Sequence, residues 1–344
     1  MNPKVSVIMP VLNGEKYIGE AIESVLTQKY GPVELIVIND GSTDGTSSLL
    51  ARFQDRIRVV EHERNMGIVR SMNDGVSAAT GGFIAFLDSD DVWLPEFLQV
   101  QVEYLHSHPD AGMVHSDFMT IDENSEVLEE SVAKCRNRGV RPSGNIYPQL
   151  FMDSMICGDA VLIRRECFEK LGSFDEALRF GDYDMWLRIA RHYKVDYVER
   201  VLTKYRQHSS QSHRNAQRTV STVIPPSPDS GAVLTLQKQL KMFPDVVREL
   251  GSRQIAQRLA QLNFEAALFW YERGIFQHAR TCLLRSFRSQ PVRVRKHLPL
   301  LLLTMFRPQR AWAIQSALDS LRKKNRNEVV ERVQRIGSSR PVNN

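Results

Sequence analysis

Three aspartates, Asp88, Asp90 and Asp91, directly follow an apolar run in the sequence FLDSDDVW of residues 86–93. Carboxylates gathered at one point repel one another unless a cation or a proton relieves the charge. In an extended stretch Asp88 and Asp90 would point the same way, so that both could face one cation. Their oxygen ligands suit Mg²⁺ or Mn²⁺, with diphosphate oxygens completing the coordination shell. The alternative is a helix cap, for which Asp91 is the better candidate.

A fourth aspartate, Asp40, ends a second apolar run, ELIVIND at residues 34–40, and precedes a turn rich in Ser and Thr. Gly41 in that turn lets the backbone approach a ligand closely. A carboxylate there can accept hydrogen bonds from a nucleotide base or a ribose. Alternatively, Asp40 begins an Asx-turn or caps the following helix, and taken alone the residue favours this second interpretation.

The elements that must position these aspartates alternate between strands and helices. We expect strands at residues 5–11, 34–40, 57–62 and 82–90, and helices at residues 15–29, 42–53 and 67–80. Strands that are apolar on both faces and alternate with helices indicate a parallel sheet covered by helices. Ligands bind at the carboxyl ends of such strands. Asp40, Asp88 and Asp90 would therefore meet at one edge, which favours a functional site over separate turns.

The rest of the chain is less regular and then becomes helical. We expect strands at residues 111–122, 159–165 and 203–208, a loop at 123–147, and helices at 180–193, 254–274 and 275–291. The last two helices resemble one tetratricopeptide helix pair. The polar, Pro- and Ser-rich stretch before them predicts a linker or mobile loop. The predicted division is a domain over residues 1–210, a linker over 211–231 and a basic α-helical region over 232–344.

Charge is distributed unevenly between these parts. From Gly231 onwards the chain has 21 Lys and Arg residues and 7 Asp and Glu residues, whereas the part before it has 24 and 33. The basic region is either a solvated helical surface or one attracted to an anionic membrane. Its apolar run LPLLLLTMF, residues 298–306, is too short to span a bilayer, which takes about 20 apolar residues. It is therefore expected to form a buried helix or to lie on a membrane surface.

The expected location is the cytoplasm, with peripheral contact to the inner face of the cytoplasmic membrane as the alternative. The N-terminal residues predict a strand entering a turn rather than a signal peptide. The four cysteines form no CxxC pair, which fits a reducing compartment and indicates neither a zinc knuckle nor a disulfide framework.

Four segments in order carry a family resemblance. They read VSVIMPVLNGEKYIGEAIESVLTQ, ELIVINDGSTDGT, RNMGIVRSMNDGVSAATGGFIAFLDSDD and GDYDMWLRI. With these motifs the chain resembles the family 2 glycosyltransferases over about residues 4–208, and the helical region lies outside the match. The resemblance implies an α/β GT-A fold with a Rossmann-like, mostly parallel sheet. It also implies inverting transfer of a sugar from a nucleotide-sugar donor, with a divalent metal, Mn²⁺ or Mg²⁺.

The same resemblance implies a donor site. Asp40 would bind the base, usually uracil; Asp88 would contact the ribose and the metal; and Asp90 would be the principal metal ligand. The residues implied to bind the nucleotide sugar are Pro10, Val11, Asn13, Glu15, Asp40, Asn65, Gly67, Arg70, Asp88 and Ser89.

A catalytic base is also implied by position. The family often has a Glu-Asp pair before its xDxWLR helix, and the Asp is the base; here the pair is Gly181-Asp182. An inverting displacement needs a carboxylate opposite the leaving diphosphate to take a proton from the acceptor hydroxyl. Asp184 is the competitor and is expected to cap the helix, which leaves Asp182 as the predicted catalytic residue. The absent Glu bears on acceptor handling rather than on the base.

The segment YRQHSSQS, residues 205–212, resembles the family's YRxHxxS segment. His208 is predicted to reach the metal or the diphosphate, with a structural or solvated histidine as the alternative, and Arg206 to reach the phosphates. Acceptor contacts are assigned to Phe174 in the GSFDE loop, to Trp186 and to Asp184. The alternatives are a simple turn for that loop and core packing for Trp186.

The predicted function is transfer of a sugar from a UDP- or dTDP-linked donor to a hydroxyl of a glycan or lipid-linked acceptor, in polysaccharide or cell-envelope glycan synthesis. Nucleic acid is not among the expected partners. The alternative is a non-catalytic nucleotide-sugar-binding or partner-recruiting protein, against which Asp40, Asp88, Asp90 and Asp182 argue. A nucleotidyltransferase would need a Gly-rich basic loop after the first strand, and a dehydrogenase would need GxGxxG there; PVLNGEKY provides neither.

Overall fold

The computed structural model describes residues 2–135, 141–154, 156–178, 181–209 and 231–290. They belong to two compact units: one holds the residues up to Ser209 together with Gly231–Ile255, and the other begins at Ala256. None of the helices in these ranges is both long enough and apolar enough to cross a membrane. The apolar run 298–306 and almost all of the predicted linker lie outside the described residues, so the predicted division into domains stays a prediction.

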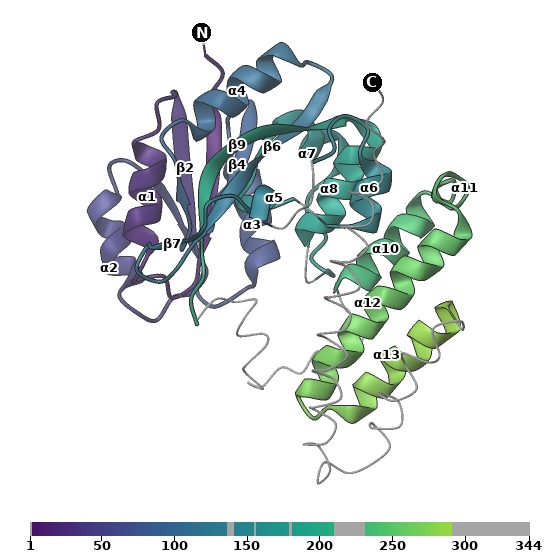
Figure 1. Ribbon diagram of the computed structural model, residues 1–344. Coiled ribbons are helices and arrows are strands. Elements are labelled where there is room, and N and C mark those ends of the chain that lie inside the picture. The colour runs from purple at the N-terminus through teal and green to yellow at the C-terminus, as the bar shows by residue number, and fades with distance from the viewer. Residues whose placement is uncertain (1, 136–140, 155, 179–180, 210–230, 291–344) are drawn as a thin grey trace, which may run out of the picture. The chain divides into compact units, whose positions relative to one another are not determined.

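A sheet of nine strands forms the centre of the first unit, counted over the described residues (Figure 1). The strand order is β3-β2-β1-β4-β8-β6-β9-β5, with β7 beside β6. The strands are β1 Val5–Val11, β2 Val33–Asn39, β3 Arg58–Glu61, β4 Phe83–Phe86, β5 Val92–Trp93, β6 Ala111–Ile121, β7 Val127–Glu129, β8 Val161–Arg164 and β9 Lys194–Arg206. The four strands β3, β2, β1 and β4 pair in parallel, as predicted.

The strand directions bring distant parts of the chain to one edge of the sheet. β8 is antiparallel to both of its neighbours, β4 and β6, and β9 is parallel to β6. β6 and β9 therefore run in the same direction as β1, β2 and β4. Their carboxyl ends, and the beginning of β8, lie at a common edge, which we call the site edge.

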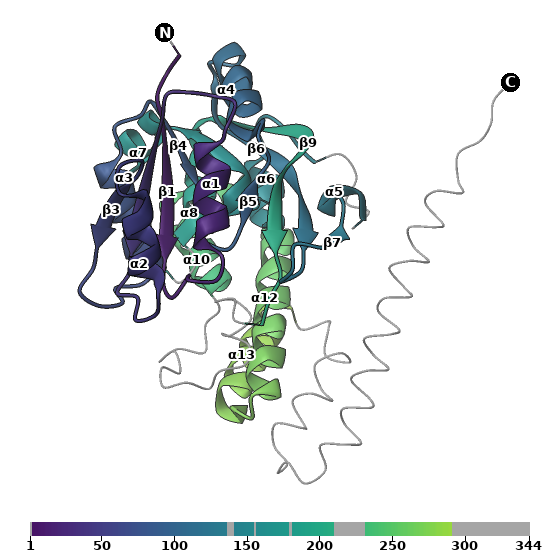
Figure 2. The same ribbon diagram turned by 90° about the vertical axis from the view of Figure 1, so that its left-hand side faces the viewer.

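Helices cover both faces of this sheet (Figures 1 and 2). Side chains of α1 and α4 share a core with Val5, Val7 and Met9 of β1, whereas α3 packs on the opposite face. The helices of the first unit are α1 Ile18–Leu26, α2 Thr46–Leu50, α3 Ile68–Ala78, α4 Phe97–Ser107, α5 Val132–Cys135, α6 Tyr147–Met152, α7 Arg165–Leu171, α8 Gly181–His192, α10 Gly231–Met242 and α11 Val246–Leu250, with 3₁₀ turns η1 Ala51–Phe53 and η2 Gly158–Ala160.

The sequence of β1, VSVIMPV, explains why it lies in the middle of the sheet. All seven of its residues are buried, and six of them are apolar, so apolar side chains point to both covered faces. On the α3 side, a Cβ atom at Gly75 would lie 2.3 Å from Ile8 Cγ2. Helix α3 can approach the strand this closely because residue 75 has no side chain.

Three predictions for this unit are wrong. β9 covers 13 residues, far more than the predicted 203–208, because it pairs with β6 along most of its length. The predicted loop 123–147 contains β7 and α5. Asp91 caps no helix: α4 begins at Phe97, and Asp91 lies before β5 with its side chain buried.

The second unit contains most of α12, Ser252–Glu272, and all of α13, Phe276–Ser289. The helices lie where the sequence predicts them. A small core joins them, and Ser286 Oγ donates a hydrogen bond to the Ala260 carbonyl at 2.6 Å. The buried core residues are Ala266, Ala267, Trp270, Ala279, Cys282 and Leu283. The likeness of this pair to a tetratricopeptide repeat stays a prediction.

Candidate active site

Asp88 and Asp90 lie in a turn that follows β4 at the site edge. The strand ends at Phe86, and the Asp91 backbone N–H donates to the Asp88 carbonyl at 3.1 Å. The expectation of an extended stretch is therefore wrong, although the two carboxylates remain neighbours in one turn. The Asp88 side chain is exposed, and those of Ser89 and Asp90 are partly exposed.

Asp159, which was not predicted from the sequence, joins this turn from η2. Its Oδ1 accepts a hydrogen bond from the Asp88 backbone N–H at 2.6 Å, and the residue is buried. Asp159 precedes β8, which is antiparallel to its neighbours, so the beginning rather than the end of that strand reaches the site edge. The strand at 159–165 was predicted, but its direction was not, and direction is the signal that would have identified Asp159.

The carboxylates at this point perturb one another. Burial raises the pKa of Asp159 from 3.8 to about 6. The charge of Asp159, together with the charges of Asp90 and Asp182, raises the pKa of Asp88. Burial, and then the charge of Asp159, raises the pKa of Asp91. The turn therefore concentrates negative charge that a cation or protons would relieve.

Asp182 approaches the same cluster from the first turn of α8. Its charge is among those that raise the pKa of Asp88, which places the two carboxylates in one electrostatic environment. Burial also raises the pKa of Asp182 itself. A Cβ atom on the preceding Gly181 would lie 3.1 Å from Val69 Cγ1 and 3.3 Å from Phe174 Cβ. The tight packing gives a physical reason for glycine where the family often has Glu.

His208 and Arg206 reach the acidic turn from the end of β9. His208 Nε2 lies 2.8 Å from Asp90 Oδ2, so the structure brings together two of the three predicted metal ligands. Arg206 is buried, and its guanidinium donates to the Asp90 carbonyl at 2.8 Å and to Glu20 Oε2 at 2.6 Å. The expectation that Arg206 reaches phosphates is therefore wrong, because its side chain holds the turn from within the protein.

Asp40 organises the loop after β3. Its Oδ1 accepts a hydrogen bond from the Met66 N–H at 2.7 Å and its Oδ2 accepts one from the Gly67 N–H at 2.9 Å. His62 Nδ1 lies 2.8 Å from Oδ1. These contacts fix the loop that contains the predicted nucleotide contacts Asn65 and Gly67. Farther along, Arg70 is exposed and its Nε donates to Asp74 Oδ2 at 2.9 Å.

The loop after β1 is fastened to the loop after β2. The Asn13 backbone N–H donates to Ser42 Oγ at 2.9 Å, and Asn13 Oδ1 accepts from the Thr43 N–H at 2.8 Å. Glu15 Oε2 accepts from the Gly45 N–H at 2.7 Å. Pro10 and Val11 are buried at the end of β1. These four predicted donor residues shape the site edge, and their direct contact with a nucleotide stays a prediction.

The three predicted acceptor residues are buried. Trp186 is 1% exposed, Phe174 3% and Asp184 0%. The Phe174 ring meets the rings of Phe86 and Trp186 edge-on, with centroids 5.4 and 6.2 Å apart. Burial favours core packing for Trp186 over a sugar platform. The expected cap role of Asp184 is wrong, since its carboxylate pairs with Arg188 inside α8 at 2.9 Å.

The carboxylates of the acidic turn after β4 could bind a divalent cation. Asp88 and Asp90 offer carboxylate oxygens in one turn, and a cation would relieve the repulsion that raises the pKa of Asp88. In the described part of the chain, no three His, Cys, Asp or Glu side chains form a group that could hold a metal ion. The residues fit a cation that takes its remaining ligands from a substrate and water, rather than one enclosed by protein ligands.

Comparison with known proteins identifies the family. Residues 6–172 match the model of Glycosyl transferase family 2. A glycosyltransferase of Methanocaldococcus jannaschii is 32% identical over 214 residues, which are 59% of this chain and 71% of that protein. The chain belongs to glycosyltransferase family 2. A Rickettsia prowazekii glycosyltransferase is 33% identical over 217 residues, 62% of this chain and 67% of that protein. The predicted family and the prediction of an enzyme are thereby confirmed.

Solved structures confirm the predicted GT-A fold. Staphylococcus aureus TarS, residues 1–349, in complex with UDP-GlcNAc has a TM-score of 0.54 at 18% identity and covers 88% of this chain and 79% of its own. The mannosyltransferase PcManGT of Pyrobaculum calidifontis, in complex with GDP-Man and Mn²⁺, has a TM-score of 0.52 at 18% identity, covering 92% and 85%. At this identity the likeness concerns the fold alone.

Proposed function

We propose that this glycosyltransferase moves a sugar from a nucleotide-sugar donor to a hydroxyl of a glycan or lipid-linked acceptor, with inversion at the anomeric carbon. The observation that carries the proposal is the acidic turn after β4, where His208 Nε2 from the end of β9 lies 2.8 Å from Asp90 Oδ2 and Asp159 Oδ1 accepts from the Asp88 N–H at 2.6 Å. The proposed base Asp182 belongs to the first turn of α8, and its charge contributes to the raised pKa of Asp88.

The proposed donor is a UDP- or dTDP-sugar. The relatives of known structure carry UDP-GlcNAc or GDP-Man, which supports a nucleoside diphosphate sugar as the class. Asp40 already receives hydrogen bonds from two backbone N–H groups and lies beside His62. A carboxylate has about four acceptor positions, so Asp40 keeps capacity for one N–H of a uracil or thymine ring.

The proposed metal is Mn²⁺ or Mg²⁺, held by Asp88 and Asp90 with His208 beside Asp90. When bound, the cation would neutralise charge on the leaving diphosphate. Pro10, Val11, Asn13, Glu15, Asn65, Gly67, Arg70 and Ser89 are the proposed surroundings of the nucleotide.

Asp182 is the proposed catalytic base. Its carboxylate takes the proton of the acceptor hydroxyl while the new bond to the anomeric carbon forms and the bond to the diphosphate breaks. The burial that raises the pKa of Asp182 makes the carboxylate a stronger base than an exposed aspartate. Activity should therefore fall as the pH drops through this raised pKa, because the base becomes protonated.

The setting we propose is polysaccharide or cell-envelope glycan synthesis in the cytoplasm. The excess of basic residues after Gly231 supports peripheral contact with an anionic membrane that carries a lipid-linked acceptor. A buried helix for residues 298–306 is the competing proposal. Vesicle flotation of the full chain and of a chain ending at residue 291 separates the two, because only the membrane proposal requires the truncated chain to lose binding.

The function is tested with the full chain and a panel of UDP-, dTDP- and GDP-sugars. Release of nucleoside diphosphate is measured with Mn²⁺ and again with EDTA, and Asp55→Asn, an exposed acid outside the site edge, serves as the control. We expect turnover of one donor class, loss of turnover with EDTA, and a product whose anomeric configuration by NMR is opposite to that of the donor. Turnover indifferent to EDTA would refute the metal, and a retained configuration would refute the inverting mechanism.

A further inference from the structure

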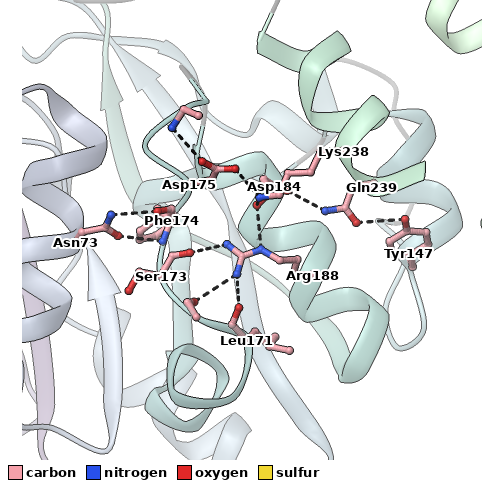
Figure 3. Close-up of polar contacts among 12 residues, drawn as sticks. Asn73, Tyr147, Leu171, Ser173, Phe174, Asp175, Asp184, Arg188, Lys238 and Gln239 are labelled. Carbon is pink, nitrogen blue, oxygen red and sulfur yellow. Dashed lines mark hydrogen bonds and ion pairs between the residues drawn. The ribbon is translucent and has the colours of Figure 1, made fainter. Parts of the chain in front are cut away.

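A buried network of charged and polar side chains joins α10 to α8 (Figure 3). Asp184, which has no exposed surface, accepts hydrogen bonds from three side chains. Arg188 Nε and Lys238 Nζ lie 2.9 and 2.8 Å from its Oδ2, and Gln239 Nε2 lies 2.9 Å from its Oδ1. Lys238 and Gln239 belong to α10, and their partners Asp184 and Arg188 belong to α8. Both helices lie outside residues 6–172, which match the family model.

Lys238 also reaches the loop that precedes α8. Its Nζ lies 2.8 Å from Asp175 Oδ2, so a single ammonium group bridges Asp175 and Asp184 (Figure 3). Arg188 donates to the carbonyls of Leu171 and Ser173 at 2.6 and 2.8 Å. The loop 172–176 is thereby held from α8 and from α10 at the same time.

A third helix holds the same loop. On α3, Asn73 Nδ2 donates to the Phe174 carbonyl at 3.0 Å, and Asn73 Oδ1 accepts from the Phe174 N–H at 2.9 Å (Figure 3). Because both backbone groups of Phe174 are bonded, the residue has little freedom to shift. Its ring meets Phe86, the last residue of β4, edge-on.

The position of Phe174 determines where α8 begins. A Cβ atom on Gly181 would lie 3.3 Å from Phe174 Cβ, so the start of α8 packs closely against the Phe174 side chain. Asp182 is the next residue, and Asp184 follows in the same helical turn. The first turn of α8 is therefore held at Gly181 by Phe174 and at Asp184 by the network of Arg188, Lys238 and Gln239.

We propose that Lys238 is a positioning residue for glycosyl transfer: by bridging Asp175 and Asp184 it fixes the first turn of α8 and so places Asp182 against Asp88. The inference rests on the proposed function in taking Asp182 as the base. A displacement of about 1 Å of a catalytic group can cost about a hundredfold in rate. Helix α10 then contributes to the transferase site by positioning Asp182.

Loss of the Lys238 charge should leave the fold intact. Asp184 keeps Arg188 and Gln239, so its buried charge remains paired. Asp175 is partly exposed and can be hydrated. The fold can therefore lose the Lys238 bridge between Asp175 and Asp184. On our proposal, what changes without the bridge is the position of the first turn of α8.

The test uses the full chain with Lys238→Met, with Lys238→Arg as the conservative variant, and with Lys241→Met as the matched control on an exposed part of the same helix. Turnover, with Mn²⁺, of the UDP-, dTDP- or GDP-sugar that the unaltered chain consumes gives kcat and KM. Binding of UDP with Mn²⁺ gives Kd, and circular dichroism with the melting temperature reports the folded fraction.

We expect Lys238→Met to lower kcat by about 10- to 100-fold, with KM and the Kd of UDP within about twofold of the unaltered chain. Lys238→Arg should restore most of kcat, and Lys241→Met should change nothing. A kcat within about twofold of the unaltered chain, or a loss that matches the unfolded fraction, would overturn the proposal.

Asp182→Asn separates this inference from the proposed function. If Asp182→Asn turns over donor as fast as the unaltered chain, the base assignment itself fails, and the role of Lys238 fails with it. If Asp182→Asn is inactive while Lys238→Met is fully active, only the positioning role of Lys238 is refuted.

Discussion

At the donor end of the site, side chains of one loop bind backbone N–H groups of another loop, whereas at the base end side chains from helices far apart in sequence also form ion pairs with one another. At the donor end, Asp40 binds the backbone of residues 66 and 67, and Asn13 binds the turn after β2. At the base end, Asn73 of α3 and Lys238 of α10 hold the loop and the helix turn around Asp182.

This difference has consequences for how each end responds to mutation. A loop that is fixed by backbone contacts depends on backbone conformation and close approach, so glycines are its sensitive points. A helix turn that is fixed by ion pairs between remote side chains depends on single charges, so one substitution on α10 can move it without touching the donor loops.

The largest effect is expected at Gly41 of the donor end. Its φ is +72°, and a Cβ atom would lie 2.5 Å from the Arg64 carbonyl carbon. Gly41→Ala should lower the free energy of unfolding by about 3 kcal/mol, since strained backbone and a clash with backbone atoms add together. Urea denaturation measures this, and UDP binding with Mn²⁺ should weaken in parallel because Asp40 adjoins the strained residue.

Gly19→Ala is the matched control for that substitution. Gly19 lies in α1, and a Cβ atom there would meet nothing within 4 Å. The variant should be as stable as the unaltered chain or more stable by up to about 1 kcal/mol, because alanine favours helix. Equal stability of the two glycine variants would contradict the claim that backbone conformation fixes the donor end.

A smaller effect is expected from Asp159, which binds the Asp88 backbone N–H. Its folded-state pKa of about 6 lies above the ordinary 3.8, so the folded chain binds this proton more tightly than the unfolded chain. The stabilisation is fully present below pH 3.8 and is lost as the pH rises through about 6. The free energy of unfolding of the unaltered chain should therefore drop between pH 4.5 and 7.5. In Asp159→Asn, which has no carboxyl to titrate, the drop should be smaller by about 2 kcal/mol.

The measurement is urea denaturation of metal-free protein at both pH values. The asparagine oxygen can still accept the hydrogen bond from the Asp88 N–H, so the substitution isolates the charge. Asp55→Asn is the control and should lose as much free energy of unfolding between the two pH values as the unaltered chain does. If Asp159→Asn also loses that amount, the buried carboxyl does not bind its proton as described.

The sequence was most informative at the donor end. The apolar strands predicted that Asp40 and Asp88 would lie at one edge of the sheet, because parallel strands bring their carboxyl ends to the same edge. Asp159 escaped notice because β8 runs the other way, and strand direction depends on partners far along the chain. The turn conformation of Asp88 and Asp90 was also missed, since period-two alternation cannot show where a strand stops.

At the base end, the sequence predicted Asp182 but not its surroundings. Asp184, Phe174 and Trp186 were assigned to the acceptor, yet all three are buried. Their burial depends on residues such as Asn73 and Lys238, which no local pattern links to α8. Side chains whose partners lie far away in sequence are the part that local reasoning could not supply.

Ion pairs of α10 and α11 explain part of the charge asymmetry between the acidic part before residue 231 and the basic part after it. Lys238, which follows residue 231, pairs with Asp175 and Asp184, which precede it. Conversely, Arg191 of α8 precedes residue 231, and its Nη1 lies 2.7 Å from Oε2 of Glu249 in α11. Some of the basic and acidic residues on either side of residue 231 therefore neutralise one another inside the first unit. The proposed attraction to a membrane would involve the remaining basic residues.

The most direct measurement compares Asp90→Asn with Asp182→Asn in one pair of assays. Each full-length variant is titrated with UDP in the presence of Mn²⁺, and donor turnover is measured on the same preparation. We expect Asp90→Asn to weaken UDP binding by at least about tenfold. Asp182→Asn should bind UDP within about twofold of the unaltered chain and lose about a thousandfold in turnover. Unchanged turnover in Asp182→Asn, or unchanged UDP binding in Asp90→Asn, would contradict the account.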